Sequence, residues 1–261
     1  EEVTEVANVV NTAAGVRAAG KERVRISVEN KVVYATLPAK PEKVFVGRTH
    51  RKGLYRIGLQ EPETYIGNHR EKLLEVNLTD SEMKVILATS ENEENLDAVN
   101  TWDHQFISFG MFQWTAGGPG KPGELPALIK IVKERYPDDF QHYWGQFGLD
   151  VVDVDKKTGW FSYRGKKLTS AADKAMLREH IWAYRFVRAG ADIEVQAAQI
   201  LHAINRIHQF YAVKSSKLDG YALVDLITSE YGVALLLDNH VNRPGYIRGC
   251  VAAALERSNL T

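Results

Sequence analysis

Short segments that alternate apolar and polar residues dominate the first quarter of the chain. RVRISVEN, KVVYATLP, EKVFVGR and GLYRIGL lie between residues 23 and 60, are rich in β-branched and aromatic residues, and are separated by Asn, Pro and Gly. This pattern predicts a small antiparallel sheet. The preceding VTEVANVVNTAAGVRAA, residues 3–19, has apolar residues at helical spacing and stops at Gly20, so it predicts a helix. We therefore expect residues 1–75 to form a small α+β accessory module.

Helical periodicity takes over from Leu78. LTDSEMKVILATSE predicts a helix capped by Thr79 or Asp80. The segment VVDVDKKTGWFSYRGKKL predicts a β-hairpin insert. Further helices are expected at 125–136, from after Ser170 to Gly190, after Asp192, and at 221–229, 231–241 and 246–257. The predicted fold class is α+β, with a mainly α domain over residues 76–261 that contains a small β insert.

Composition narrows the classes of partner. The 261 residues are 44% hydrophobic and 25% charged, which suits a globular protein with a substantial core. Lys plus Arg and Asp plus Glu both number 33, so the net charge gives no reason to expect a nucleic-acid partner. No stretch approaches the roughly 18 consecutive apolar residues typical of a membrane span.

Motifs for metal and cofactor chemistry are absent from the sequence. The single cysteine, Cys250, excludes an intrachain disulfide and a Cys-based zinc cluster, and HExxH does not occur. His202 and His208 are six residues apart on one predicted helix, away from a common face, and His180 is isolated. GxGxxG, the P-loop motif and GxSxG are also missing. We expect no metal and no cofactor.

The segment ENEENLDAVNTWDHQFISFGMFQWTAGG, residues 91–118, is the best candidate for chemistry. A carboxyl group at the end of an apolar helix, followed by a glycine-rich aromatic strand, suits a glycosidase acid, because desolvation raises the pKa of the carboxyl group. By composition alone, Glu91, Glu93 and Glu94 could equally be a solvated acidic turn. Residue type and spacing leave both interpretations open.

The stretches EENLDAVNTWD and SFGMFQWTAGG resemble the lysozyme-like superfamily of glycan hydrolases, in which a helix-terminal Glu precedes an FDAINTYD-like loop and an SFGxxQF-like strand. Goose-type lysozymes, lytic transglycosylases and chitosanases belong to that superfamily. The match covers residues 93–118, with weaker support from LLLDNHVNRPGY near residues 238–246. The predicted order of helices and β insert also resembles that fold, whereas the N-terminal sheet does not.

Carried over to this chain, the resemblance makes Glu93 the general acid. It makes Asp97 and Asp103 candidates for a second carboxylate and Thr101 a residue that positions water. The residues expected to bind sugar are Ser108, Gly110, Gln113, Trp102, Trp114, Trp144, Tyr246 and Asn242. Asn242 or the neighbouring Arg243 is expected to shape the cleft, and a plain corner between two helices is the alternative, because Pro244 disfavours helical geometry at Arg243.

Two points about the acid stay open. Related sequences tend to have glycine at the position of Glu94, so this residue could be solvent-facing, could alter the pKa of the acid, or could mark a loss of catalysis. Counting back from the FG pair would instead select Glu91. In a helix that continued through both residues, Glu93 would share the face of Ile86, and for that reason we expect Glu93 to be the acid.

The resemblance implies an enzyme that cleaves the β-1,4 bonds of peptidoglycan glycan strands, by hydrolysis or by transglycosylation. The lack of a ligand cluster in the sequence predicts that this enzyme is metal-independent. A chitosanase, or a non-catalytic glycan-binding component of a phage or secretion assembly, is the alternative. The implied partner is a polysaccharide. The implied location is the cell wall, reached by secretion, in the periplasm, or through phage or secretion-system delivery.

Overall fold

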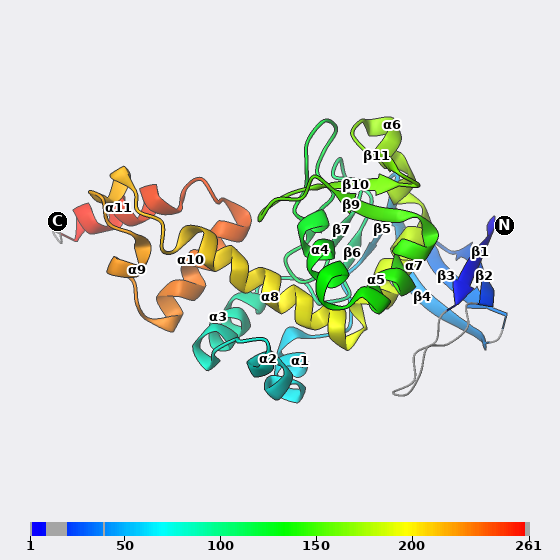
Figure 1. The fold of residues 1–261 in the computed structure, drawn as a ribbon, viewed down its shortest axis with the longest axis horizontal. Helices are drawn as coiled ribbons and strands as arrows, with labels where there is room; N and C mark the ends of the chain where they lie inside the picture. The colour runs from blue at the N-terminus through cyan, green and yellow to red at the C-terminus, as the bar shows by residue number, and fades with distance from the viewer. Residues whose placement is uncertain (1, 9–19, 39, 259–261) are drawn as a thin grey trace. The chain divides into compact units, whose positions relative to one another are not determined.

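The computed structural model describes residues 2–8, 20–38 and 40–258. The chain is α+β and divides into two compact units, shown as a ribbon in Figure 1. Unit 1 comprises Glu1–Glu61 and Glu94–Gln199, and unit 2 comprises Pro62–Glu93 and Ile200–Thr261. A single boundary between residues 75 and 76 was expected. In the structure each unit instead takes two separate stretches of the chain.

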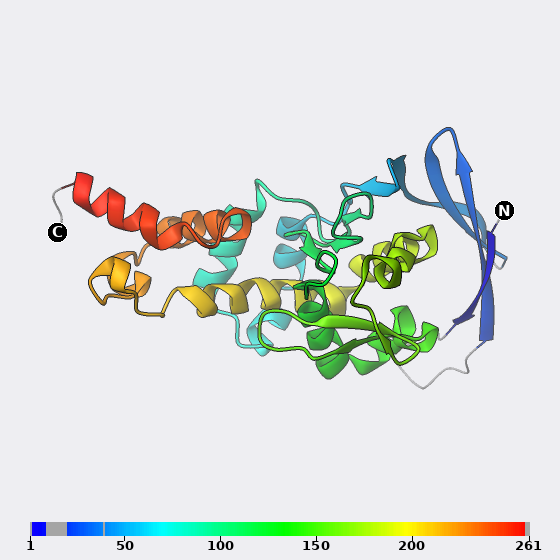
Figure 2. The same cartoon turned by 90° about the horizontal axis from the view of Figure 1, so that it is seen from above.

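An antiparallel sheet runs through unit 1 in the strand order β1 to β8. Its strands are β1 (Glu2–Asn8), β2 (Gly20–Glu29), β3 (Val32–Leu37), β4 (Lys40–His50), β5 (Gly53–Arg56), β6 (Val99–Asn100), β7 (Ser108–Phe109) and β8 (Trp114–Thr115). Burial alternates along β3, as the sequence pattern predicts. Residues Asn30 and Lys31 have positive φ, which fits the tight turn between β2 and β3. The long strands β2, β3 and β4 are clearest in Figure 2.

The expected N-terminal helix is wrong where the structure describes it. Glu2–Asn8 is strand β1, paired with β2 from Glu2 opposite Ile26 to Asn8 opposite Gly20. In this segment the pairing with β2 determines the secondary structure, although the apolar residues are spaced as in a helix. Residues 9–19, which carried most of that spacing, lie outside the described residues.

Helices and a second sheet complete unit 1. The helices are α4 (Leu125–Arg135), α5 (Pro137–Tyr143), α6 (Ala171–Lys174), α7 (His180–Gly190) and the first part of α8 (Ile193–Phe210). Strands β9 (Leu149–Val152), β10 (Trp160–Tyr163) and β11 (Lys166–Lys167) form the predicted β insert. The helix expected from Ser170 to Gly190 is interrupted, because a 3₁₀ turn follows α6 and Glu179 adopts an extended conformation before α7.

Unit 2 is helical. It contains α1 (Pro62–Asn68), α2 (Arg70–Glu75), α3 (Asp80–Ser90), the second part of α8, α9 (Leu223–Leu226), α10 (Glu230–Asn242) and α11 (Ile247–Arg257). The predicted start of α3 is confirmed, since Thr79 caps it in a reciprocal pair of hydrogen bonds with Glu82. The Thr89 hydroxyl bonds to the Val85 carbonyl within this helix.

Candidate functional site

The acidic segment begins where α3 ends. Ser90 is the last residue of the helix and Glu91 caps it, so Glu93 lies outside the helix and, contrary to expectation, does not continue the helical face of Ile86. Glu91 is exposed, whereas Glu93 and Glu94 are partly buried. The division between the two units falls between Glu93 and Glu94.

Glu94 has an environment that disfavours the ionised form of its carboxyl group. Its backbone N–H donates to the Met111 carbonyl at 3.1 Å, which fixes the residue beside the turn that follows β7. Its Oε2 atom is buried and has no hydrogen-bond partner among the described residues. Burial raises the pKa of this carboxyl group above its ordinary value. Glu94 therefore has the partial burial and the raised pKa that were expected of Glu93.

The buried amide of Gln199 joins the acidic loop to the same turn. From α8, its Nε2 donates to the Leu96 carbonyl at 2.8 Å, and its Oε1 accepts from the Met111 N–H at 3.2 Å. These two bonds connect the loop that follows Glu94 to the turn that follows β7. Gln199 was not among the residues predicted from the sequence, although a glutamine between Ala198 and Ile200 on an apolar helix face is a detectable signal.

Gly110 and Gln113 form the turn against which Glu94 rests. Gly110 has φ of +78°, and a Cβ atom there would overlap the side-chain oxygen of Gln199. The backbone and side-chain N–H groups of Gln113 both donate to the Gly110 carbonyl at 3.0 Å. Both residues therefore build the turn, and their expected contacts with sugar remain a prediction.

Asp97 is held by hydrogen bonds on both of its oxygens. Oδ2 accepts from Arg56 Nη2 at 2.7 Å and Nε at 3.1 Å, and Oδ1 accepts from the N–H groups of Leu59 and Gln60 at 2.6 and 2.8 Å. The side chain is buried. A Cβ atom on Gly190 would lie 2.5 Å from Asp97 Cα, so the end of α7 packs directly on this residue. These contacts favour an anchoring role over the predicted catalytic one.

Replacing Asp97 with Asn should lower the free energy of unfolding by about 3–5 kcal/mol, because the buried Arg56 guanidinium loses its counter-charge. Urea denaturation followed by circular dichroism measures this change. Asp80→Asn is the matched control, since the exposed Arg70–Asp80 pair should contribute at most about 1 kcal/mol. Equal losses in the two variants would contradict the anchoring role.

Thr101 and Asp103 differ in how fully hydrogen bonds within the fold engage them. The buried Thr101 hydroxyl accepts from the Leu54 N–H at 2.9 Å, and the Thr101 carbonyl accepts from Arg178 at 2.8 Å. Asp103 is half-buried, and its Oδ1 accepts from the Gln105 N–H at 2.8 Å. Of the three polar residues predicted to assist the acid, Asp103 is therefore the least committed to the fold.

The aromatic residues expected to stack on sugar are mostly core residues. Trp114 is 1% exposed in β8 and Trp144 is fully buried, so neither presents a ring face, and this expectation is wrong for both. Ser108 is buried in β7, opposite Asn100 and Thr115. Successive side chains of a strand point to opposite faces, and the sequence did not show which face of β8 is buried.

The remaining predicted sugar contacts belong to unit 2. Tyr246 is 68% exposed between α10 and α11. Asn242 is exposed, and its side-chain amide donates to the Asp238 carbonyl at 3.1 Å. Helix α10 ends at Asn242, before Pro244, as predicted. The role of this corner in shaping a cleft stays a prediction.

Lys174 fixes the glycine-rich loop that follows β8. It is 1% exposed, and its ammonium donates to four backbone carbonyls at 2.7–3.0 Å and lies 4.9 Å from the centre of the Trp160 ring. The four carbonyls belong to Ala116, Gly117, Gly118 and Lys121. Burial lowers the pKa of the ammonium to about 8, so it stays mainly protonated at pH 7. The sequence offered no signal that this lysine points inward.

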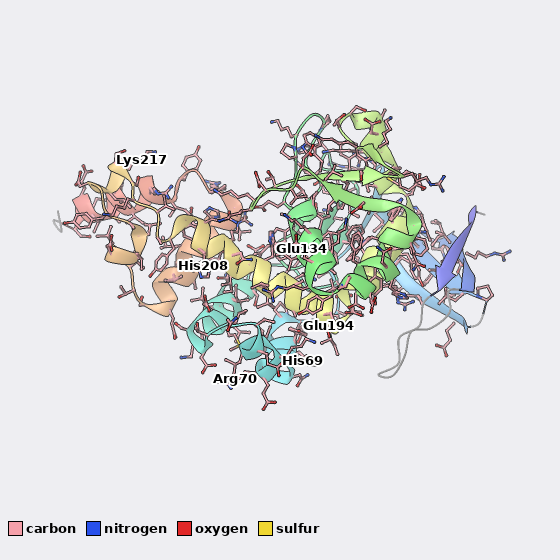
Figure 3. All side chains as sticks on the ribbon, in the orientation of Figure 1. His69, Arg70, Glu134, Glu194, His208 and Lys217 are labelled. Carbon is pink, nitrogen blue, oxygen red and sulfur yellow. The ribbon has the colours of Figure 1, made fainter. Side chains whose placement is uncertain are left out.

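The histidines that the structure describes do not gather into a ligand cluster. His202 is buried, and burial lowers its pKa to about 3. His208, labelled in Figure 3, lies 3.1 Å from Glu82 at the surface of unit 2. The described residues contain no cluster of three or more His, Cys, Asp or Glu side chains suited to a metal ion. They also contain no helix with the length and hydropathy needed to cross a membrane.

The arrangement around Glu94 supplies one chemical capability, which is proton donation. The carboxyl group is partly buried with a raised pKa, and its loop is fixed by hydrogen bonds to Met111 and through Gln199. Desolvation favours the protonated form of a carboxyl group, which is the form that a general acid requires. Comparison of the chain with protein-family models, with curated proteins and with solved structures gives no match.

Proposed function

We propose that this protein cleaves the β-1,4 glycosidic bonds of peptidoglycan glycan strands, with Glu94 as the general acid. The observation that carries the proposal is the buried, unpartnered Oε2 of Glu94 in a loop bonded to the turn after β7. The resemblance of residues 93–118 to the lysozyme-like superfamily supports the substrate class. The assignment to Glu94 differs from the expected Glu93 because of the burial and raised pKa of Glu94.

In this mechanism protonated Glu94 donates its proton to the glycosidic oxygen as the bond to the anomeric carbon breaks. The sugar develops oxocarbenium character, and the departing chain leaves as a neutral alcohol. Asp103 is the best remaining candidate for steadying the positive charge, because Asp97 is already bound by Arg56 and two amides. Attack by water completes hydrolysis, and attack by a hydroxyl group of the same sugar completes a transglycosylase reaction.

Purified sacculi provide the direct test. We expect the protein to release soluble muropeptides, and their masses distinguish a reducing end from an anhydro end. Release should be unchanged by EDTA, because the proposed chemistry uses a carboxyl group alone. Chitosan and dextran serve as comparison substrates.

Each alternative outcome has a defined meaning. Faster cleavage of chitosan than of sacculi would replace peptidoglycan with a cationic polymer as the substrate. Binding to sacculi without release of any fragment would favour the non-catalytic glycan-binding component. Activity that EDTA removes and zinc restores would refute the carboxyl mechanism.

A further inference from the structure

The hairpin formed by β4 and β5 carries an exposed basic surface on unit 1. In the sheet register Arg48 lies opposite Tyr55, and Tyr55 lies opposite Asn100, so these three side chains share one face. Leu54, on the other face, is fully buried, which makes the first face the outer one. His50 shares the outer face, because it is two residues from Arg48. The hairpin can be followed in Figure 2.

Positive charge is concentrated in this hairpin, although the whole chain is neutral. KPEKVFVGRTHRKGLYR, residues 40–56, contains six Lys or Arg residues and one Glu. Two of the six are already paired, Lys43 with Glu29 and Arg56 with Asp97. The three residues Arg48, Arg51 and Lys52 are exposed and form no ion pair with another described residue. The surface therefore presents cations without a protein counter-charge.

Trp102 holds one of these cations in place. The Arg51 guanidinium lies 4.6 Å from the centre of the Trp102 ring. The His50 ring meets Trp102 edge-on at 4.9 Å and Tyr55 edge-on at 6.1 Å. Such contacts reduce the freedom of a long side chain, so Arg51 is pre-organised for an anion. Trp102 is half-buried and contacts the Arg51 guanidinium, and its predicted stacking on a sugar stays a prediction.

An apolar hollow adjoins the basic surface. It has a volume of about 340 Å³ and is lined by Phe45, Arg48, Tyr55, Arg56, Ile57, Gly58 and Leu59. Ile57 and Leu59 are 63% and 73% exposed, which is unusual for large aliphatic side chains in close proximity. Arg56 is bound to Asp97, so Arg48 is the cation available at the edge of the hollow. A ligand that fits here has an aliphatic part and an anionic part.

We propose that this β4–β5 surface binds the carboxylate-bearing peptide substituents of the glycan strand. The carboxylates would pair with Arg48 and Arg51, whose guanidinium groups suit bidentate bonding, and the small aliphatic side chains of the peptide would enter the hollow. The identity of this ligand rests on the proposed function. The surface then provides a reason for the N-terminal sheet, which the superfamily resemblance does not cover.

Binding can be measured apart from cleavage by cosedimentation of the full chain with sacculi, in the Glu94→Gln background. The double substitution Arg48→Gln, Arg51→Gln should weaken binding at least about tenfold, because two charge-assisted contacts are lost. The matched control is Arg135→Gln, Lys157→Gln, which removes the same charge from exposed positions elsewhere on unit 1. The control should stay within about twofold of the parent protein.

Chemical modification of the sacculi identifies the ligand group. Sacculi whose carboxylates have been amidated should bind the parent protein as weakly as intact sacculi bind the double variant. Unchanged binding to amidated sacculi, or unchanged binding by the double variant, would overturn the proposal. Tighter binding of a single-stranded DNA oligomer through the same two arginines would make this a nucleic-acid surface and would also overturn it. Weakened binding by the variant, with no muropeptide release by wild type, would reject the hydrolase and leave the surface standing.

Discussion

Replacing Glu94 with Gln should lower the rate of glycan cleavage by roughly 10²–10⁴-fold, because the amide keeps the shape of the side chain but has no proton to transfer. Muropeptide release from sacculi measures the rate, and cosedimentation confirms that the variant still binds. Glu91→Gln is the control, since Glu91 is exposed at the end of α3 and should be dispensable.

Glu93→Gln separates the two candidate acids. The assignment to Glu94 predicts retained activity in this variant, whereas the superfamily resemblance predicts loss. An inactive Glu93→Gln together with an active Glu94→Gln would restore the assignment made from the motif. Full activity in all three Glu→Gln variants would place the catalytic carboxyl elsewhere.

The pH dependence of stability provides a test of the Glu94 environment that needs no substrate. Because burial raises the folded-state pKa, the unfolded chain loses its proton at lower pH than the folded chain, and stability falls as pH rises between the two pKa values. Below the unfolded pKa this penalty is absent. Glu94→Gln should therefore unfold at a higher temperature than wild type near pH 7 and at an equal temperature in acid. Activity that requires the protonated form should fall as pH rises through the folded pKa.

Lys174→Met should lower the free energy of unfolding by about 2–4 kcal/mol, because several buried carbonyls lose their donor, while the removal of a buried charge offsets part of that loss. Amide hydrogen exchange should also accelerate in the loop of residues 116–121, which the ammonium holds. Lys166→Met is the matched control, because the Lys166 side chain is 74% exposed and its ion pair with Asp173 should contribute little to stability.

Lys174→Arg tests whether charge alone suffices. A planar guanidinium cannot direct its donors to the same four carbonyls as a compact ammonium, so this variant should also be destabilised. Stability equal to wild type in both Lys174 variants would show that the carbonyls find other partners, such as water, and would contradict the anchoring role.

Local features of the chain were predictable from sequence. The cap of α3 at Thr79 and the β insert follow from short-range rules of capping and alternation. These features depend on residues a few positions apart. Their energetic causes are therefore visible in a short window of sequence.

Long-range contacts were not predictable in this way. The pairing of β5 with β6 joins Tyr55 to Asn100, and this link merges the N-terminal strands with the motif strands into one sheet. Likewise, Gln199 and Lys174 reach loops many tens of residues away. No periodicity in the sequence specifies which loop a buried polar side chain will contact. For this reason the expected domain boundary differs from the observed division, and the anchoring roles of Gln199 and Lys174 were not predicted.

The interleaved order of the two units has a consequence for synthesis of the chain. When Glu61 leaves the ribosome, the edge of β5 has no partner, because β6 lies some forty residues further on. Unit 1 cannot be completed before Gln199 is made, and unit 2 must wait for residues 200–261 to join its first segment. A nascent chain therefore exposes an open strand edge from the synthesis of β5 until β6 is made, which is the condition under which intermolecular strand pairing begins. Expression of the full chain at low temperature with chaperones should therefore raise the soluble yield. Dividing the expressed chain at residue 75 should raise it less, because both units need residues from beyond that point.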